Sequence, residues 1–282
     1  MMYNDSFRVR YGSAPVAISE NAEHYDTAPH IHAEIEMLYI KRGRAQIFVS
    51  DRSYTVSEGE VVIVNPMEVH SVIADKTLPY HQMCICFDLS LLPDKSMADE
   101  LTSGGSYING FLKNDEQLTG PVKEYFERMF YSVLHSSDVL LFESTAYASL
   151  IFAELKKYGY IISKRSGGKK SEFASKVQAY LSEHFSENIT SEHAARELFY
   201  TQSYFCRLFR ENFGVPFLEY LSMYRISKAK TLLSDTSLKI SDIAESVGFL
   251  DQSYFSRCFK HFIGVSPSEY KKHQYSNIKK SI

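Results

Sequence analysis

The sequence predicts a multi-domain α+β protein with a strand-rich first half and an all-helical second half. Its 282 residues exceed one ordinary domain. Short β-rich runs separated by turn residues fill the region from about 20 to 90, and apolar residues recur with helical spacing from residue 118 onward. Residues 163–171, rich in glycine, serine and cations, are predicted to form the linker between the halves.

The first half contains six short runs rich in β-branched and aromatic residues. Turn-forming residues separate them, among them Gly43, Asp51, Gly59 and Asn65-Pro66. Short strands alternating with tight turns are typical of a small β-barrel or sandwich. We therefore predict a barrel over about residues 20–90, with strands at 35–40, 45–50, 53–56, 61–64, 71–74 and 82–87.

Two helices are predicted after the barrel, within about residues 118–160. Apolar residues recur at i, i+3, i+4, i+7, i+8 and i+11 in the first helix, and five of them crowd one side of the second, over about 139–158. Two such helices usually cover a sheet face, but an exposed stripe would also serve for dimerisation. The first stripe is Val122, Tyr125, Phe126, Met129, Phe130 and Val133, and the second is Phe142, Ala146, Leu150, Ile151 and Ala153.

Charge is distributed unevenly between the two halves. The whole chain carries a net charge of −3. Residues 1–162 hold 13 Lys and Arg against 22 Asp and Glu, a balance of −9, whereas residues 163–282 hold 18 against 12, a balance of +6. An acidic first half and a basic second half are expected if only the second half contacts the phosphates of a nucleic acid.

Cysteine usage and hydropathy predict a cytoplasmic protein. Cys84, Cys86, Cys206 and Cys258 show neither a C-x-x-C pair nor the spacing of a disulfide framework, which favours reduced, unremarkable thiols. Residues 1–13 lack the apolar core of a secretory signal. No run approaches the roughly 18 apolar residues of a membrane span, so no membrane partner is expected.

The second half, residues 172–282, contains an internal repeat. Residues 202–210 recur as residues 252–260: both segments begin Gln-Ser-Tyr-Phe and place Arg sixth and Phe eighth. The match extends upstream with a separation of forty-nine, so the first copy is one residue shorter between its two helices. Each copy therefore predicts helix, tight turn and helix, at about 190–213 and 240–263, and a third helix joins the copies.

Turn and cap residues support these helices and distinguish the copies. Ser241, Asp251 and Thr201 are predicted N-caps, and Gly248 permits the positive φ of a tight turn. The first copy has Phe199-Tyr200 where the second has Gly248-Phe249, and its Pro216 comes one position earlier than Pro267. We therefore expect unequal contributions from the two copies.

The second helix of each copy presents two distinct faces. At 100° per residue, Phe205, Leu208 and Phe209 cluster toward a core, and a polar stripe lies opposite. Small side chains around a central Arg let a helix enter a major groove, where Arg can bind guanine and a neighbouring cation can hold phosphate. The stripes contain Ser203, Cys206, Arg207 and Arg210 in the first copy, and Ser253, Ser256, Arg257 and Lys260 in the second.

The second half resembles the DNA-binding domain of AraC/XylS-type regulators. The resemblance spans about residues 171–272 and rests on Ile243-Ala244, Val247-Gly248-Phe249, Ser253-Tyr254-Phe255, Phe259-Lys260 and Ser266-Pro267, among others. It implies two recognition helices that enter successive major-groove segments of operator DNA. Base contacts would then fall to Gln202, Ser203, Cys206 and Arg207, and to Gln252, Ser253, Ser256 and Arg257.

The barrel resembles the cupin, or jelly-roll, fold. His30-x-His32, then Glu36 and Gly43, and later Gly59, Pro66 and His70 follow the order of the two cupin motifs. Three imidazoles and a carboxylate can bind a divalent metal. The second motif departs from the pattern, because Glu68 stands near the expected glycine and His70 comes one residue early. We therefore assign His30, His32, Glu36 and His70 to an effector pocket, without metal or other cofactor. His81 is a weaker candidate for the same pocket.

These observations favour a transcription regulator, not an enzyme. The leading hypothesis is a homodimeric activator that binds an effector, such as a sugar, in the barrel, binds operator DNA and contacts RNA polymerase. The first alternative is a metal-dependent cupin enzyme with an appended DNA tether. The second is a constitutive DNA-binding protein whose empty barrel only dimerises.

Overall fold

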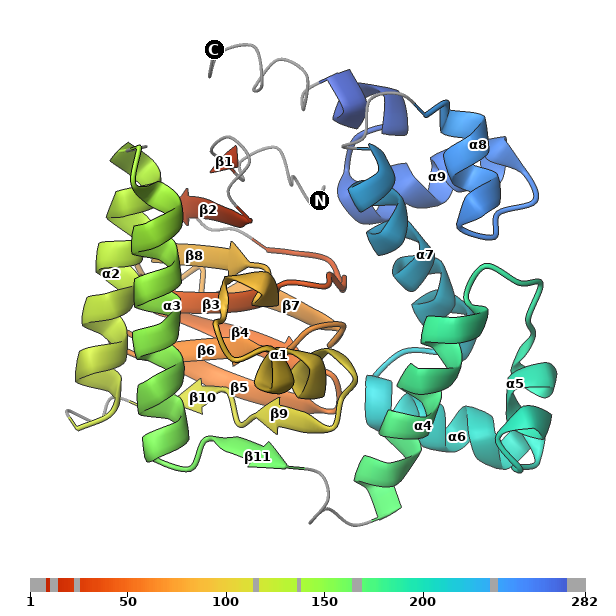
Figure 1. Ribbon diagram of the computed structural model, residues 1–282, viewed down its shortest axis with the longest axis horizontal. Helices are drawn as coiled ribbons and strands as arrows, with labels where there is room; N and C mark the ends of the chain where they lie inside the picture. Colours follow the sequence, from red (N-terminus) through yellow and green to blue (C-terminus); the bar gives the residue numbers. More distant parts are fainter. Residues whose placement is uncertain are drawn as a thin grey trace.

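The computed structural model describes residues 9–10, 15–22, 26–113, 117–135, 138–163, 169–233 and 238–272 (Figure 1). A strand-rich part is followed by a helical part, as the sequence predicts. Figure 1 shows α2 and α3 on one side of the sheets and the helical part on the other side. No helix among the described residues is long and apolar enough to cross a membrane.

The six predicted strands of the barrel are all present. Their bounds are Ile35–Arg42 (β3), Arg44–Val49 (β4), Arg52–Ser57 (β5), Val61–Val64 (β6), His70–Ala74 (β7) and His81–Phe87 (β8). Five further short strands were not predicted, because most have too few residues to show an alternation. They are Val9–Arg10 (β1), Val16–Asn21 (β2), Ser106–Ile108 (β9), Phe111–Leu112 (β10) and Ile161–Ser163 (β11).

The strands form two main sheets, of order β1-β2-β8-β3-β6-β10 and β5-β4-β7. Both faces of β3 are buried, so its side chains alternate between two cores. Ile35 and Met37 join the core beneath the helices. Leu38 and Ile40 join the core between the sheets. Glu36 shares that inner face, and its Cα partner across the ladder is Cys86 of β8.

Two long helices, Thr119–His135 (α2) and Leu140–Lys157 (α3), cover the larger sheet. The predicted stripe of α2 is buried apart from the half-buried Tyr125. Of the predicted stripe of α3, Ile151 is buried, whereas Phe142, Ala146, Leu150 and Ala153 are exposed. The buried face of α3 is instead formed by Leu140, Ser144, Ala148, Ile151, Phe152 and Leu155. Phe142 is 77% exposed and Leu150 41% exposed. Apolar residues occupy more than one face of α3, so the pattern alone could not choose the buried one.

The connection between the two halves is shorter than the composition predicts. Ser163 ends β11, where it pairs with Ser106 of β9. Lys169 begins the helix Lys169–His184 (α4). Residues 164–168 of the predicted linker lie outside the described residues. Small polar and charged residues are compatible with a strand end or a helix start as well as with a linker, so composition alone could not place the ends of the linker.

The helical part contains the predicted repeat. The first copy is Ser191–Glu197 (α5) and Gln202–Phe213 (α6), and the second is Ile240–Ser246 (α8) and Gln252–Ile263 (α9). Phe217–Leu233 (α7) runs between them and packs against α6, α8 and α9 (Figure 1). Its seventeen residues span about 25 Å at 1.5 Å per residue. A short helix, Lys95–Thr102 (α1), and a 3₁₀ turn, Leu89–Leu91, were not predicted.

The helical part also packs directly against the barrel. Ile31, Met67 and Val69 of the barrel belong to the same buried cluster as the cores of α4 to α9. The hydroxyl of Tyr220 on α7 donates a hydrogen bond to the carbonyl of Met67 at 2.8 Å. Tyr220 is fully buried, and burial raises the pKa of its hydroxyl, which keeps it protonated as a donor.

Candidate nucleic-acid interface and sensor site

The predicted recognition helix of the second copy, α9, is capped at both ends. Asp251 accepts a hydrogen bond from the backbone N–H of Tyr254, as predicted for an N-cap. Gly264 ends the helix in the left-handed conformation. Phe255 and Phe259 are buried, whereas Gln252, Ser253, Arg257 and Lys260 are exposed. Ser256 is only half-buried, and its hydroxyl donates a hydrogen bond to the carbonyl of Gln252.

The recognition helix of the first copy, α6, has the same arrangement. Phe205 and Phe209 are buried and Leu208 is half-buried. All five predicted contact residues are exposed: Gln202, Ser203, Cys206, Arg207 and Arg210. Thr201 is the N-cap residue, but its side chain makes no cap hydrogen bond. The predicted N-cap at Ser241 is wrong: Lys239 occupies the cap of α8, and Ser241 lies inside the helix, bonded to Asp242.

Each central arginine lies over a tyrosine of the preceding turn. The guanidinium of Arg207 is 5.2 Å from the centroid of the Tyr204 ring, and that of Arg257 is 5.8 Å from the Tyr254 ring. Both tyrosines are partly exposed. Stacking restrains a long side chain and lowers the entropy lost when it binds a base. These tyrosines were not predicted as site residues, although their position three residues before each Arg is visible in the repeat.

The turns that precede the recognition helices differ as the sequence suggests. Gly248 has φ +89°, and Phe199 takes the same position in the first copy with φ +62°. A left-handed conformation costs a non-glycine residue roughly 1–2 kcal/mol. Phe199 is also 96% exposed. The first copy therefore keeps the turn geometry at a conformational cost that the second copy avoids.

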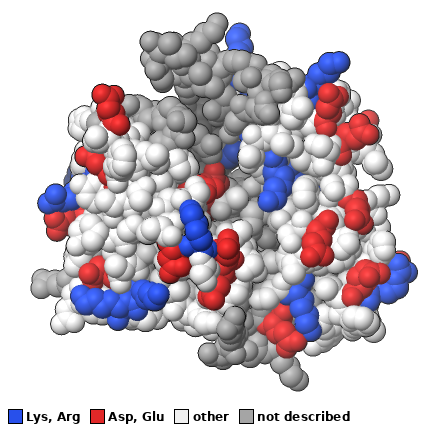
Figure 2. Space-filling view, in the orientation of Figure 1, with Lys and Arg blue, Asp and Glu red and all other residues white. Residues whose placement is uncertain are grey.

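On the face of the molecule seen in Figure 2, charge does not single out one surface. Figure 2 shows Lys and Arg side chains interspersed with Asp and Glu over the face in view. The prediction of a DNA-contacting surface therefore rests on the two matched helix stripes.

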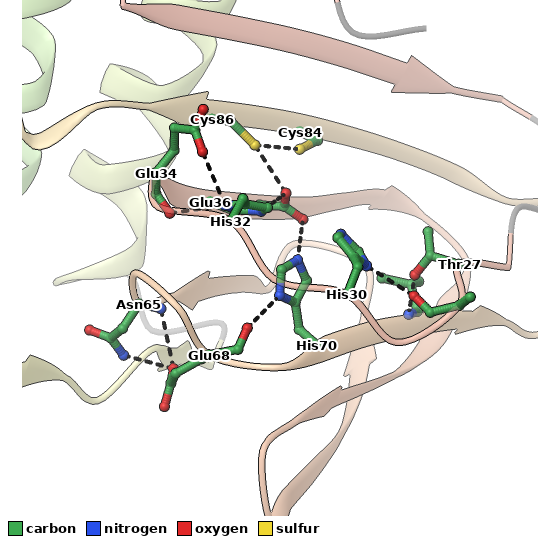
Figure 3. A network of polar contacts seen from close by, with 12 residues as sticks. Thr27, His30, His32, Glu34, Glu36, Asn65, Glu68, His70, Cys84 and Cys86 are labelled. Carbon is green, nitrogen blue, oxygen red and sulfur yellow. Dashed lines mark hydrogen bonds and ion pairs between the residues drawn. The ribbon is translucent and has the colours of Figure 1, made fainter. Parts of the chain in front are cut away.

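The predicted effector residues come together in one buried cluster. His30, His32, Glu36 and His70 are each at most 5% exposed, and their ligand-type atoms lie within 4.8 Å of one another. Glu36 Oε2 is 3.0 Å from His32 Nε2, and Glu36 Oε1 is 3.6 Å from His70 Nε2 (Figure 3). The cluster forms because β3 contributes the carboxylate, the segment before β3 contributes His30 and His32, and His30 and His70 pair through a β-bridge.

Two cysteines adjoin this cluster and were not predicted to belong to it. The thiol of Cys86 donates to Glu36 Oε2 at 3.0 Å, and Cys84 Sγ lies 3.8 Å from Cys86 Sγ. Their spacing of two residues on a strand was the available signal, because it places both on one face. His81 lies outside the cluster and pairs with Glu20 at 2.7 Å.

A cavity of about 180 Å³ opens beside the cluster. His32 and Cys86 line it, together with residues of β2 and of the segments that flank β3 and β8. The opposite wall belongs to α7 and is formed by Ser227, Lys230 and Thr231. A ligand in this cavity would therefore touch both halves of the chain.

Two helix-turn-helix units joined to a sheet-rich domain, with a cavity between the two parts, are typical of a ligand-responsive regulator, and the comparisons name its family. A helix-turn-helix domain model matches residues 194–273, and an AraC-like ligand binding domain model matches residues 13–150. An uncharacterized HTH-type transcriptional regulator of Bacillus subtilis, YisR, is 28% identical over 86% of this chain and 87% of its own length. The arabinose operon regulatory protein of Escherichia coli is 40% identical over 93 residues, 33% of this chain and 32% of that protein.

A solved structure shows the same fold. An apo ToxT variant from Vibrio cholerae superposes with a TM-score of 0.55 at 18% identity, over 94% of this chain and 100% of that one. Another ToxT structure carries an unsaturated fatty acid. This chain belongs to the AraC family of transcriptional regulators, with an AraC-like ligand-binding domain and a C-terminal DNA-binding domain.

Proposed function

We propose that this regulator is a cytoplasmic activator that binds a small effector in the cavity between its barrel and α7, and that the effector changes operator binding. The observation that supports this proposal is that residues of both halves of the chain line one cavity. An effector that contacts both halves would lose some of these contacts if the halves moved apart. It would therefore bind one conformation more tightly than the other and shift the equilibrium between them. We assign base contacts to the exposed stripes of α6 and α9.

The lining of the cavity combines apolar residues, among them Val16 and Ala17, with polar side chains that could orient an effector. Glu34, Asp88, Ser227, Lys230 and Thr231 offer carboxylate, hydroxyl and ammonium groups. A hydroxyl-rich ligand such as a sugar would satisfy them, and one relative regulates an arabinose operon. The volume of about 180 Å³ lies below the roughly 300–1,000 Å³ of sites for drug-sized ligands, so the effector is small.

A thermal-shift screen of the full-length protein tests the effector proposal. Sugars, other metabolites and unsaturated fatty acids are screened with and without chelator. We expect one class of compound to raise the melting temperature, because a ligand that binds only the folded state stabilises it. The hit should change the Kd for operator fragments selected from genomic DNA.

Filling the cavity provides the matched control. Thr231→Trp places a large side chain at an exposed position of the lining and should abolish the effector response while effector-free DNA binding persists. Lys228→Trp lies on the same helix outside the cavity lining and should keep the response. A full response in Thr231→Trp would place the effector elsewhere.

We also propose that the protein is a homodimer that pairs through the exposed face of α3. Phe142 and Leu150 are exposed on one side of this helix, which lies on the side of the sheets away from the DNA-binding domain (Figure 1). Exposed apolar side chains that cluster on a surface mark interaction sites. This arrangement would leave both recognition helices of each protomer accessible.

Light scattering during size exclusion measures the oligomeric state. Phe142→Glu combined with Leu150→Glu should convert a dimer to a monomer, because burying two carboxylates in an apolar interface is costly. Leu78→Glu introduces a charge at another partly exposed leucine, outside α3, and should leave the dimer intact. A dimer that persists in the double variant contradicts this interface.

The sign of regulation follows from a transcription assay. The reaction contains purified regulator, promoter DNA and RNA polymerase, which is the third proposed partner. We expect more transcript with effector than without it. Less transcript would identify a repressor.

A further inference from the structure

The histidine cluster concentrates lone pairs in a small buried volume. The three Nδ1 atoms each contact a backbone carbonyl: His30 with Ala28 at 2.9 Å, His32 with Glu34 at 3.1 Å and His70 with Glu68 at 2.9 Å. A carbonyl oxygen only accepts hydrogen bonds, so each Nδ1 must carry a proton. In the neutral imidazole each Nε2 is then a lone-pair donor.

These Nε2 atoms converge on a carboxylate that also offers lone pairs. His32 Nε2 and Glu36 Oε2 are 3.0 Å apart, so two acceptors face each other unless a cation lies between them. Nε2 of His70, a side chain only 1% exposed, makes no hydrogen bond within the described structure and faces the same carboxylate. Such an arrangement needs a positive charge, supplied either by a proton or by a metal ion.

The geometry matches the ligand shell of a metal ion. Zn–N and Zn–O bonds of about 2.0–2.2 Å place neighbouring tetrahedral ligands roughly 3.3–3.6 Å apart. The two distances from Glu36 to His32 and His70, 3.0 and 3.6 Å, bracket this separation. Metal-binding histidines also characteristically donate their other N–H to a carbonyl or carboxylate, as all three do here.

We propose that His30, His32, Glu36 and His70 bind one divalent transition-metal ion, such as Zn²⁺, and that its occupancy controls the contact between the barrel and α7. Imidazole nitrogens with one carboxylate suit zinc, nickel and iron. The thiol of Cys86 donates a hydrogen bond to Glu36 Oε2, and such outer partners orient a ligating carboxylate. The metal site stands on its own geometry, and its control of DNA binding rests on the proposed function.

The route from the metal site to α7 is short and built from backbone. Ile31 lies between two of the ligands and Val69 precedes the third, so their side chains point away from the site into the core of the helical part. The N–H of Met67 donates to the carbonyl of His32 at 2.8 Å, and the carbonyl of Met67 accepts from Tyr220. Met67 holds φ +60°, which is strained for a non-glycine residue.

Movement of His32 toward a metal therefore displaces the residue that holds Tyr220. A short, strained segment such as the one around Met67 can alternate between two discrete conformations. The ion fixes one of them, because it draws His30, His32 and His70 to a common centre.

Metal binding is tested first on the full-length protein. Chelator-treated, dialysed protein is titrated with Zn²⁺ by calorimetry and in competition with a chromogenic chelator. We expect one equivalent to bind and the melting temperature to rise. His70→Gln and Glu36→Gln should weaken binding at least tenfold, whereas His81→Gln, outside the cluster, should bind as the native protein does. Failure of the native protein to bind Zn²⁺, Ni²⁺ or Fe²⁺ would overturn the site and assign the charge to a proton.

The control of DNA binding is tested separately by anisotropy on an operator fragment. Zn²⁺ should change the Kd at least threefold in the native protein. Tyr220→Phe keeps the ring but removes the hydrogen bond to Met67, so Zn²⁺ should still bind while the Kd responds less. Stoichiometric Zn²⁺ binding with an unchanged operator Kd would refute the control by metal. Absence of operator binding both with and without metal would instead refute the assigned DNA-contacting stripes.

Discussion

Replacing Arg257 with alanine is expected to weaken operator binding by about 1–3 kcal/mol, roughly 5- to 150-fold, at one base-pair position while the fold stays intact. Arg257 is exposed on α9 and held over the ring of Tyr254. An arginine at this place can bind guanine O6 and N7 with both arms of its guanidinium. Alanine at this exposed position removes no core contact.

Fluorescence anisotropy on a series of duplexes with single substitutions measures this effect. The loss should be confined to duplexes that keep the preferred base pair, because only these offer the contact. Lys260→Ala supplies the contrast, since a phosphate contact should weaken all sequences alike and reduce the salt dependence. Arg207→Ala should behave as Arg257→Ala does at a different position. Uniform weakening by either arginine variant would show that these side chains touch only phosphate.

Replacing Gly248 with alanine is expected to lower the free energy of unfolding by about 3 kcal/mol. Gly248 has φ +89°, where an added side chain is strained. Its Cβ would also lie 2.7 Å from the carbonyl oxygen of Ser186 and 2.9 Å from two further backbone atoms of that residue. Backbone atoms cannot rotate away as a flexible side chain can, so the turn must shift away from Ser186.

Urea denaturation followed by far-UV circular dichroism checks this value. Gly120→Ala is the matched control, because Gly120 lies in α2 with nothing within 4 Å of its added Cβ. That variant should be neutral or slightly more stable, since alanine favours helix. Equal stability of Gly248→Ala and the native protein would mean that the turn relaxes at no cost.

The sequence predicts the elements better than it predicts their surroundings. The six barrel strands, the α2 stripe and both helix-turn-helix units follow from local periodicity and from the repeat, which need no knowledge of distant residues. The face of α3 does not follow, because Phe142 and Leu150 are as apolar as the residues that are buried. Burial depends on which partner the helix meets.

The same distinction applies to the sites. The arginine stripes could be predicted, because a helix wheel fixes which side chains share a face. The four cluster residues could be grouped by motif order, but the approach of Cys86 to Glu36 depends on the register between β3 and β8. The contact of Met67 with Tyr220 joins residues 153 positions apart, and no local pattern encodes it.

The position of α7 restricts what any signal can change. This single helix contributes buried residues to the common core of both helix-turn-helix units and also touches the barrel. We therefore expect the two predicted recognition helices to move together with α7. A ligand could change whether the pair engages DNA, but we expect the length of α7 to keep the separation between the two groove segments constant, so operators should share one internal spacing.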